Sequence, residues 1–261
     1  MDLPTLQLLL EDLPLGAVDY SPVLDSTNAR AQRWISSGAS HLSLVVADEQ
    51  TAGRGRNGRT WLTPPGSAIA FSLILLPEVN NPISIPYLSP LGALAVCESL
   101  QSMYDLPALI KWPNDILLFG EKAAGILVET EWQGEQFHSA VLGIGINVAP
   151  GSVPEPSEIN FPATCVEGAL GRSVDRWALM KGVIERVIKR LQDFDQQKFL
   201  QAWEDKLAFT GETVQLLRKD EQPIIGQLEG LMRDGSLRLL LPNGKVLSVR
   251  AGEIHLRAVD S

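Results

Sequence analysis

Apolar residues recur at helical spacing or in short runs along most of the chain, and this pattern predicts its elements. Helices are predicted over residues 26–38, 88–103 and 174–207. The first has Ser26 or Thr27 as its N-cap and Gly38 at its end. The last stretch is expected to divide into two helices, with a break near residues 193–195.

Strand-like runs, many of them rich in β-branched residues, lie between these helices. They cover residues 41–48, 67–76, 108–112, 115–119, 123–132 and 137–148. Turn residues separate the later runs, namely Pro113-Asn114-Asp115, Gly120 and Gly134. Strands joined by short turns pair in antiparallel order. The pattern therefore predicts an α+β fold, with a mixed, mostly antiparallel sheet and helices on one side of it.

The pattern changes after Gly211, where only short strands and turns follow. The runs cover residues 212–217, 224–232, 236–241 and 245–250. Asp234-Gly235 and Asn243-Gly244 are turn dipeptides, and the second is a strong hairpin signal. We predict a larger domain over residues 1–210 and a small SH3-like β-barrel over residues 211–261.

The composition narrows the class of protein. The chain has 261 residues, of which 45% are hydrophobic and 20% charged, as in globular proteins. No apolar run reaches the ~20 residues of a membrane span, and the net charge of −9 disfavours a broad nucleic-acid surface. Two cysteines without a Cys-x-x-Cys motif and three scattered histidines disfavour a disulfide scaffold and a preformed metal site. We expect a soluble, cytoplasmic enzyme or binding module.

The segment Gly53–Trp61 is unusual because three arginines and three glycines are interleaved in an otherwise acidic chain. Glycine lets the backbone approach an anion closely, and successive N–H groups can then cradle its oxygens. Arginine adds a planar, charged fork for the same oxygens. We predict a loop that closes on a phosphate or a carboxylate. A solvated basic loop, or one that contacts RNA, is the open alternative.

Lys111 is the second candidate, since it ends an apolar strand beside Trp112 and before a Pro-Asn turn. A lysine held there can be partly desolvated and can stabilise negative charge on a reacting phosphate or carboxylate. Asp115 could then orient the lysine or hold Mg²⁺. The alternative is an ordinary surface lysine, with Trp112 in the core.

Two glycine-containing strands complete the candidate chemistry. Lys122–Glu129 places small residues before an apolar strand, and Gly143–Val148 carries two glycines. A glycine inside a strand often marks the close approach of a ligand or another backbone, although a bulge or a plain hairpin explains the same pattern. Asn147 is placed to contact a purine edge or a phosphate. The tryptophans, Trp61 among them, are expected to pack in the core or at a rim.

Six motifs stand in a fixed order along the chain: Ser26-Thr27-Asn28, Gln50–Trp61, Lys111–Asp115, Lys122–Leu127, Gly143–Asn147 and Gly252–Arg257. In this combination the sequence resembles the biotin–protein ligases, also called biotin–[acetyl-CoA-carboxylase] ligases. The resemblance covers about residues 20 to 258, and the combination is far more specific than any single motif.

The resemblance implies a catalytic domain that binds biotin and ATP, followed by an SH3-like barrel. Biotin and MgATP would give biotinyl-5′-AMP and pyrophosphate, and biotin would then pass to one lysine of a biotin carboxyl-carrier domain. The residues implied to bind biotin or the adenylate are Ser26, Thr27, Asn28, Gln50, Gly53, Arg54, Gly55, Arg56, Lys111 and Gly125. Lys111 and Arg56 are the implied catalytic residues, and Asn114 and Asn147 the implied nucleotide contacts. No preformed metal site is implied, and Mg²⁺ would be bound as MgATP.

Two departures from the family pattern bear on function. Asn57 stands where many bacterial members have another arginine. Only 25 residues precede Ser26, without a basic recognition helix, so we expect a monofunctional ligase without the N-terminal DNA-binding domain. A lipoate or octanoate ligase, a DNA-binding biotin sensor and a scaffold whose barrel binds proline-rich peptides are the alternatives. A monomer and a homodimer fit the sequence equally well.

Overall fold

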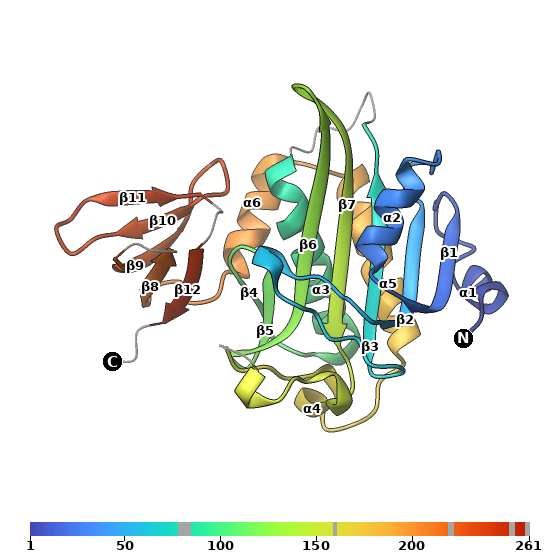
Figure 1. The fold of residues 1–261 in the computed structure, drawn as a ribbon. Helices are drawn as coiled ribbons and strands as arrows, with labels where there is room; N and C mark the ends of the chain where they lie inside the picture. The colour runs from blue at the N-terminus through green and yellow to red at the C-terminus, as the bar shows by residue number, and fades with distance from the viewer. Residues whose placement is uncertain (78–84, 159–160, 219–221, 251–253, 259–261) are drawn as a thin grey trace.

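A seven-stranded sheet forms the larger part of the molecule (Figure 1). The computed structural model describes residues 1–77, 85–158, 161–218, 222–250 and 254–258. The sheet order is β1-β2-β3-β7-β6-β5-β4. The strands are β1 Val18–Leu24, β2 Leu44–Gln50, β3 Ala68–Leu75, β4 Ala108–Lys111, β5 Asp115–Leu118, β6 Glu121–Gln133 and β7 Gln136–Asn147. Only β1 and β2 pair in parallel, which confirms a mixed, mostly antiparallel sheet.

The helices of the described residues cover both faces of this sheet. They are α1 Leu3–Leu9, α2 Thr27–Ile35, α3 Leu88–Tyr104, α4 Val166–Leu170, α5 Arg176–Gln192 and α6 Gln196–Asp205. Helix α3 is apolar almost all round because it lies between the sheet and α5, and most of its residues are buried. The predicted break in the last helical stretch is confirmed, since Asp193 ends α5 and Asp195 caps α6.

Helix α2 corrects the expectation that helices lie on one side of the sheet. Leu44 and Val46 of β2 belong to the core shared with α3 and α5, whereas Val45 between them packs with Ala31 and Ile35 of α2. Since successive side chains of a strand point to opposite faces, α2 covers the other face (Figure 1). The helical periodicity predicted that α2 buries one side, but not which face of the sheet it meets.

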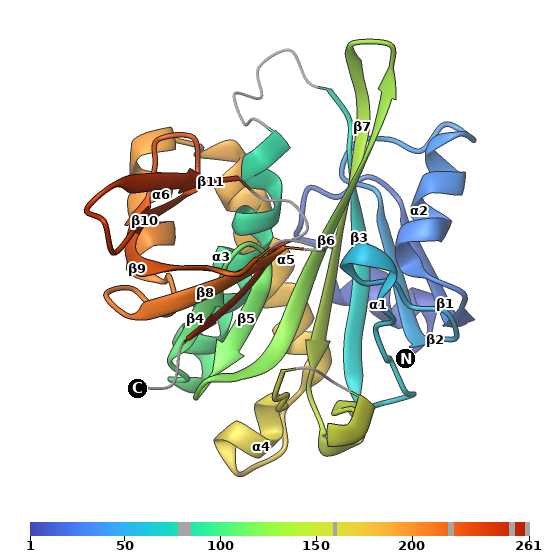
Figure 2. The same ribbon diagram turned by 60° about the vertical axis from the view of Figure 1, so that its left-hand side comes forward.

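A second, five-stranded antiparallel sheet has the order β11-β10-β9-β8-β12 and lies beside β4 and α6 (Figure 2). Its strands are β8 Thr213–Arg218, β9 Ile224–Leu231, β10 Leu237–Leu240, β11 Val246–Val249 and β12 Ile254–Ala258. Gly235 and Gly244 have φ of 79° and 77°, as the two predicted turns require. Its description as an SH3-like barrel, and the boundary at residue 210, stay predictions.

The two sheets are joined by specific contacts. The buried indole of Trp112 donates from Nε1 to the carbonyl of Gly235 at 3.3 Å. Glu204 of α6 accepts the backbone N–H of Leu231 at 2.8 Å. Trp112 is therefore a core residue, and it fixes the end of β4, whose last residue is Lys111. No helix in the described parts of the chain is long and apolar enough to cross a membrane.

Candidate active site

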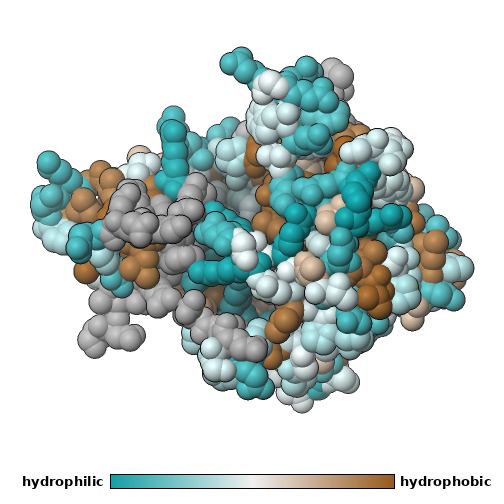
Figure 3. Space-filling model, in the orientation of Figure 1, coloured by the Kyte–Doolittle hydropathy of each residue, from teal (hydrophilic) through white to brown (hydrophobic). Residues whose placement is uncertain are grey.

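A cavity of about 710 Å³ opens on the face of the sheet that carries α2. Figure 3 shows hydrophilic residues gathered over the middle of this face. Eleven of the twelve residues singled out in the sequence line it: Ser26, Thr27, Asn28, Gln50, Arg54, Gly55, Arg56, Lys111, Asn114, Gly125 and Asn147. Gly53 does not line the cavity. A Cβ added to Gly53 would lie 2.2 Å from the Trp61 carbonyl oxygen, so this glycine allows the two ends of the loop to lie close together.

The start of α2 forms the buried polar end of this cavity. The Ser26 hydroxyl accepts the Ala29 N–H at 3.4 Å and so caps the helix. The backbone N–H and the hydroxyl of Thr27 both point to Gln50 Oε1, at 2.8 and 3.1 Å. Gln50 Nε2 donates to the Thr63 hydroxyl at 2.9 Å. These bonds fix the amide of Gln50 at the end of β2.

The amide of Asn28 packs closely against the backbone of Gly143 in β7. A Cβ added to Gly143 would lie only 2.1 Å from Asn28 Oδ1. Ser72 of β3 donates its single hydroxyl proton either to Asn28 Oδ1, at 2.6 Å, or to the Thr27 hydroxyl, at 2.8 Å. The glycine predicted to admit a ligand therefore admits a side chain that shapes the ligand site.

Glu129 of β6 lies between this group of polar side chains and the segment Gly53–Trp61, here called the arginine-glycine loop. Its Oε2 accepts from Asn28 Nδ2 at 2.8 Å and pairs with Arg54 Nη2 at 2.9 Å. Sequence reasoning did not select Ser72 or Glu129. Ser72 is the one hydroxyl in the apolar run AIAFSLIL, and that interruption was the available signal for it.

The arginine-glycine loop folds back on itself as a hairpin. Gly55 donates its N–H to the Arg59 carbonyl at 2.7 Å, and Arg59 donates to the Arg56 carbonyl at 3.2 Å. Asn57 has φ 57° and ψ 36°, and Gly58 has φ 73°. Both central residues are thus left-handed, as in a type I′ turn, for which Asn-Gly is the preferred pair.

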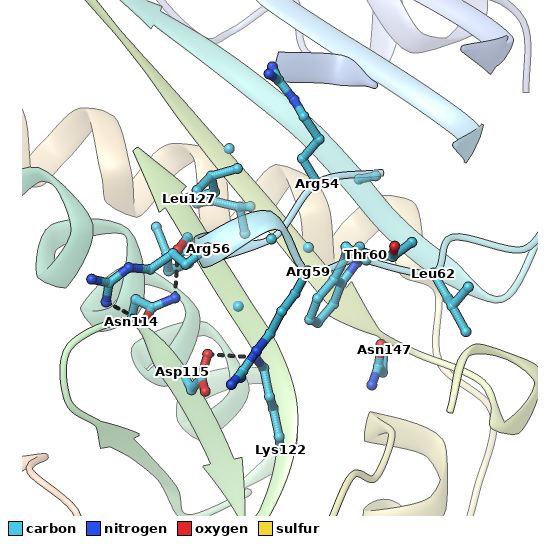
Figure 4. A pocket seen from close by; sticks show the side chains of 18 of the residues that line it. Arg54, Arg56, Arg59, Thr60, Leu62, Asn114, Asp115, Lys122, Leu127 and Asn147 are labelled. Atoms are coloured by element: carbon cyan, nitrogen blue, oxygen red, sulfur yellow. Dashed lines mark hydrogen bonds and ion pairs between the residues drawn. The ribbon is translucent and has the colours of Figure 1, made fainter. Parts of the chain in front are cut away.

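Arg56 reaches from this hairpin towards β5 (Figure 4). Its Nη1 donates to Asn114 Oδ1 at 3.1 Å, and Asn114 Nδ2 donates to the Ile126 carbonyl at 2.9 Å. Burial lowers the pKa of the Arg56 guanidinium, and the carboxylate of Asp115 acts in the opposite direction. Arg56 stays a cation, because an arginine side chain is not deprotonated in proteins.

Two lysines join Arg56 at this end of the cavity. Lys111 is only 8% exposed, and its ammonium lies 3.4 Å from the centroid of the Phe161 ring. Lys122 pairs with Asp115 at 2.6 Å and stands over the Trp61 ring at 5.4 Å. Lys111 is therefore a buried cation and not an ordinary surface lysine. The sequence analysis considered Asp115 as a group that orients Lys111 or holds Mg²⁺, and the structure shows it paired with Lys122. Lys122 belonged to a sequence motif but was not among the residues selected for the site.

Trp61 lies across the two glycine-containing strands. A Cβ at Gly145 would lie 2.4 Å from its Nε1, and one at Gly125 would lie 3.1 Å from its ring. Nε1 is buried and has no hydrogen-bond partner among the described residues. The indole ring is therefore an apolar wall of the cavity, which goes beyond the core or rim packing expected for Trp61.

Asn147 lies at the end of β7, where its Nδ2 donates to the Thr164 carbonyl at 3.0 Å.

Among the residues with a described position, no group of three or more His, Cys, Asp and Glu side chains is arranged around a possible ion. Both cysteines, Cys97 and Cys165, are buried free thiols. Burial raises the pKa of the Cys97 thiol to about 12, so it stays protonated and unreactive.

Comparison with known proteins places these features in one family. A family model described as "Biotin/lipoate A/B protein ligase family" matches residues 20–147. A biotin–[acetyl-CoA-carboxylase] ligase of Paracoccus denitrificans is 34% identical over 85% of this chain and 93% of its own length. The bifunctional ligase/repressor BirA of Bacillus spizizenii is 38% identical over 67% of this chain, a match that spans 54% of that relative.

The solved structures agree with these matches. The biotin protein ligase of Aquifex aeolicus in complex with biotin and ATP superposes with a TM-score of 0.79, at 33% identity. The match covers 93% of this chain and 99% of that one. The chain therefore belongs to the biotin/lipoate A/B protein ligase family.

Proposed function

We propose that the cavity activates biotin with ATP and then passes biotin to a lysine of a carrier protein. The chain is an ATP-dependent, AMP-forming biotin–[acetyl-CoA-carboxylase] ligase. The observation that carries this function is one cavity with a neutral hydrogen-bonding end at Thr27, Asn28 and Gln50 and a cationic end at Arg56 and Lys111. A molecule with a polar, uncharged head and a carboxylate tail fits these two ends.

The neutral end suits the ureido ring of biotin, which offers N–H donors and a carbonyl acceptor. Asn28 Nδ2 is already used by the carbonyl of Leu127, at 3.3 Å, and by Glu129. Its Oδ1 lies 2.6 Å from the Ser72 hydroxyl, and as a carbonyl oxygen with two lone pairs it can also accept from a ligand N–H. The hydroxyls of Thr27 and Ser72 can both donate and accept. Thr27, Asn28 and Ser72 are each at most 4% exposed, so a head group without hydrogen-bonding atoms would cover their polar groups and add no bond to them.

The cationic end suits the first half-reaction. A carboxylate oxygen of biotin attacks the α-phosphorus of ATP, the bond to the β,γ-phosphates breaks, and pyrophosphate leaves. Both reactants are anions, so Arg56, Lys111 and Lys122 would offset their repulsion and the charge that develops on phosphorus. Mg²⁺, bound to ATP as part of the substrate, supplies further charge neutralisation. Asn114, Asn147 and the wall made by Trp61 would position the nucleotide.

The second half-reaction joins biotin to the acceptor. The deprotonated amine of a lysine attacks the acyl carbon of biotinyl-5′-AMP, the bond from that carbon to the phosphate oxygen breaks, and AMP leaves. The loop Gly53–Trp61 would shield the mixed anhydride from water before the acceptor arrives. The acceptor is a biotin carboxyl-carrier domain.

A direct comparison of acids tests this function. Pyrophosphate release is measured with MgATP and biotin, lipoate or octanoate, each also with an apo carrier domain. Of the three acids, we expect only biotin to support pyrophosphate release and transfer to the carrier domain. Preference for lipoate or octanoate would instead assign the chain to the lipoate branch of the family. Specific, biotin-dependent retardation of DNA at ~0.1 M salt would support a sensor function instead.

A further inference from the structure

We infer that Glu129 is a positioning residue that ties the arginine-glycine loop to the biotin end of the cavity. The inference rests on the proposed function for its substrate, but its structural basis is independent of any ligand. One carboxylate oxygen, Oε2, bridges two segments far apart in the sequence: Asn28 at the start of α2 and Arg54 in the loop.

The first half of the bridge fixes Asn28. An amide side chain can turn over and exchange its oxygen and nitrogen, since both ends are polar and similar in size. Glu129 Oε2, at 2.8 Å, and the Leu127 carbonyl, at 3.3 Å, are both acceptors, so they hold the amide NH₂ on their side. Oδ1 is thereby held over Gly143, as an acceptor beside the Ser72 hydroxyl.

The second half of the bridge anchors the loop. Arg54 Nη2 lies 2.9 Å from Glu129 Oε2 and 3.2 Å from Gln32 Oε1 on α2. Figure 4 shows Arg54 pointing away from Arg56 and Lys122, and so away from the cationic end of the cavity. Arg54 therefore holds the base of the loop, while Arg56 serves the reacting anions. The Glu129 side chain is 25% exposed, so this charge pair is only partly screened by solvent.

The shared oxygen couples the two ends of the site. Loss of the negative charge on Glu129 leaves Arg54 without its ionic partner and weakens the bond that orients Asn28. Biotin binding and loop closure should therefore weaken together, without a direct effect on the cations that act on the phosphate. This pattern differs from that of a residue that merely supports the fold.

The test compares Glu129→Gln with Glu131→Gln, which makes the same substitution two residues further along the same face of β6. Glu131 is exposed, and its carboxylate lies 3.5 Å from the Ser139 hydroxyl. For Glu129→Gln we expect a biotin KM raised roughly tenfold, as for loss of one charge-assisted hydrogen bond, and a kcat within about twofold of wild type. We expect Glu131→Gln to match wild type.

A second readout needs no substrate. Trypsin cleavage after Arg56 and Arg59 should be several-fold faster in Glu129→Gln and in Arg54→Gln, and no faster in the double variant than in either single one. If Glu129→Gln does not fold, Arg54→Gln breaks the same pair from its more exposed side. Wild-type biotin KM and cleavage in Glu129→Gln, or additive effects in the double variant, would overturn the inference. A wild-type protein that does not activate biotin would overturn the proposed function but not the anchoring of the loop.

Discussion

Gly143→Ala is expected to damage the biotin site through one misplaced methyl group. The new Cβ would lie 2.1 Å from Asn28 Oδ1 and 2.9 Å from its Cγ. Non-bonded carbon and oxygen atoms sit near 3.5 Å, so the Asn28 amide must move by roughly 1 Å or more. That movement breaks its bonds to Ser72 and Glu129, which are 2.6 and 2.8 Å long. At about 0.5–1.5 kcal/mol for a neutral bond and 1.5–3 kcal/mol for a charged one, the cost is about 2–4.5 kcal/mol.

Part of this cost should appear in ligand binding. We expect biotin affinity to fall by roughly 10- to 100-fold by isothermal titration calorimetry, because Asn28 Oδ1 no longer faces the ligand. Gly151→Ala is the matched control, since its Cβ would meet Ser67 at an ordinary 3.6 Å. In an Asn28→Ala background the methyl group meets no amide, so Gly143→Ala should then cost little more. Wild-type affinity in Gly143→Ala, or additive losses in the double variant, would refute the steric argument.

Three further substitutions separate the roles of the cationic end and of the loop. Lys111→Ala should slow biotin-dependent pyrophosphate release by ~10²–10³ while the unfolding midpoint is retained, and turnover at the wild-type rate would exclude its electrostatic role. Arg56→Ala should release biotinyl-5′-AMP, so that serum albumin becomes labelled on streptavidin blots; unlabelled albumin would argue against the loop as a lid. Asn57 has φ 57°, a left-handed conformation that asparagine tolerates and alanine does not, so Asn57→Ala should cost about 1–2 kcal/mol. Tryptic cleavage of the loop should then be faster in Asn57→Ala, but not in Asn57→Gly.

Much of the fold follows from local sequence rules. The break between α5 and α6 and the Asp234-Gly235 and Asn243-Gly244 turns were predicted, because capping residues and turn dipeptides act over a few residues. Strand β1 was not predicted. Its run VDYSPVL contains a proline and lacks clean alternation, as befits a sheet edge, and it gains its place by parallel pairing with β2.

The site shows the same division between local and distant interactions. Its motifs could be found in the sequence because loops, strand ends and glycines carry recognisable residue types. Ser72 and Glu129 were missed because their partner Asn28 lies 44 and 101 residues away along the chain. The ionic partner of Arg54 was missed for the same reason: the sequence shows a cation in a loop, whereas only the folded chain shows Glu129 beside it.

Biotin transfer is measured directly by mass spectrometry of an apo biotin carboxyl-carrier domain after incubation with this protein, MgATP and an equimolar mixture of biotin, lipoate and octanoate. We expect one biotinyl group on a single lysine, with pyrophosphate released in step and no lipoyl or octanoyl product, because the ureido ring can hydrogen-bond to the buried polar groups around Asn28 and the head groups of the other two acids cannot. Lipoyl or octanoyl transfer at a comparable rate, or no modification of the carrier while the protein remains folded, would contradict the proposed function.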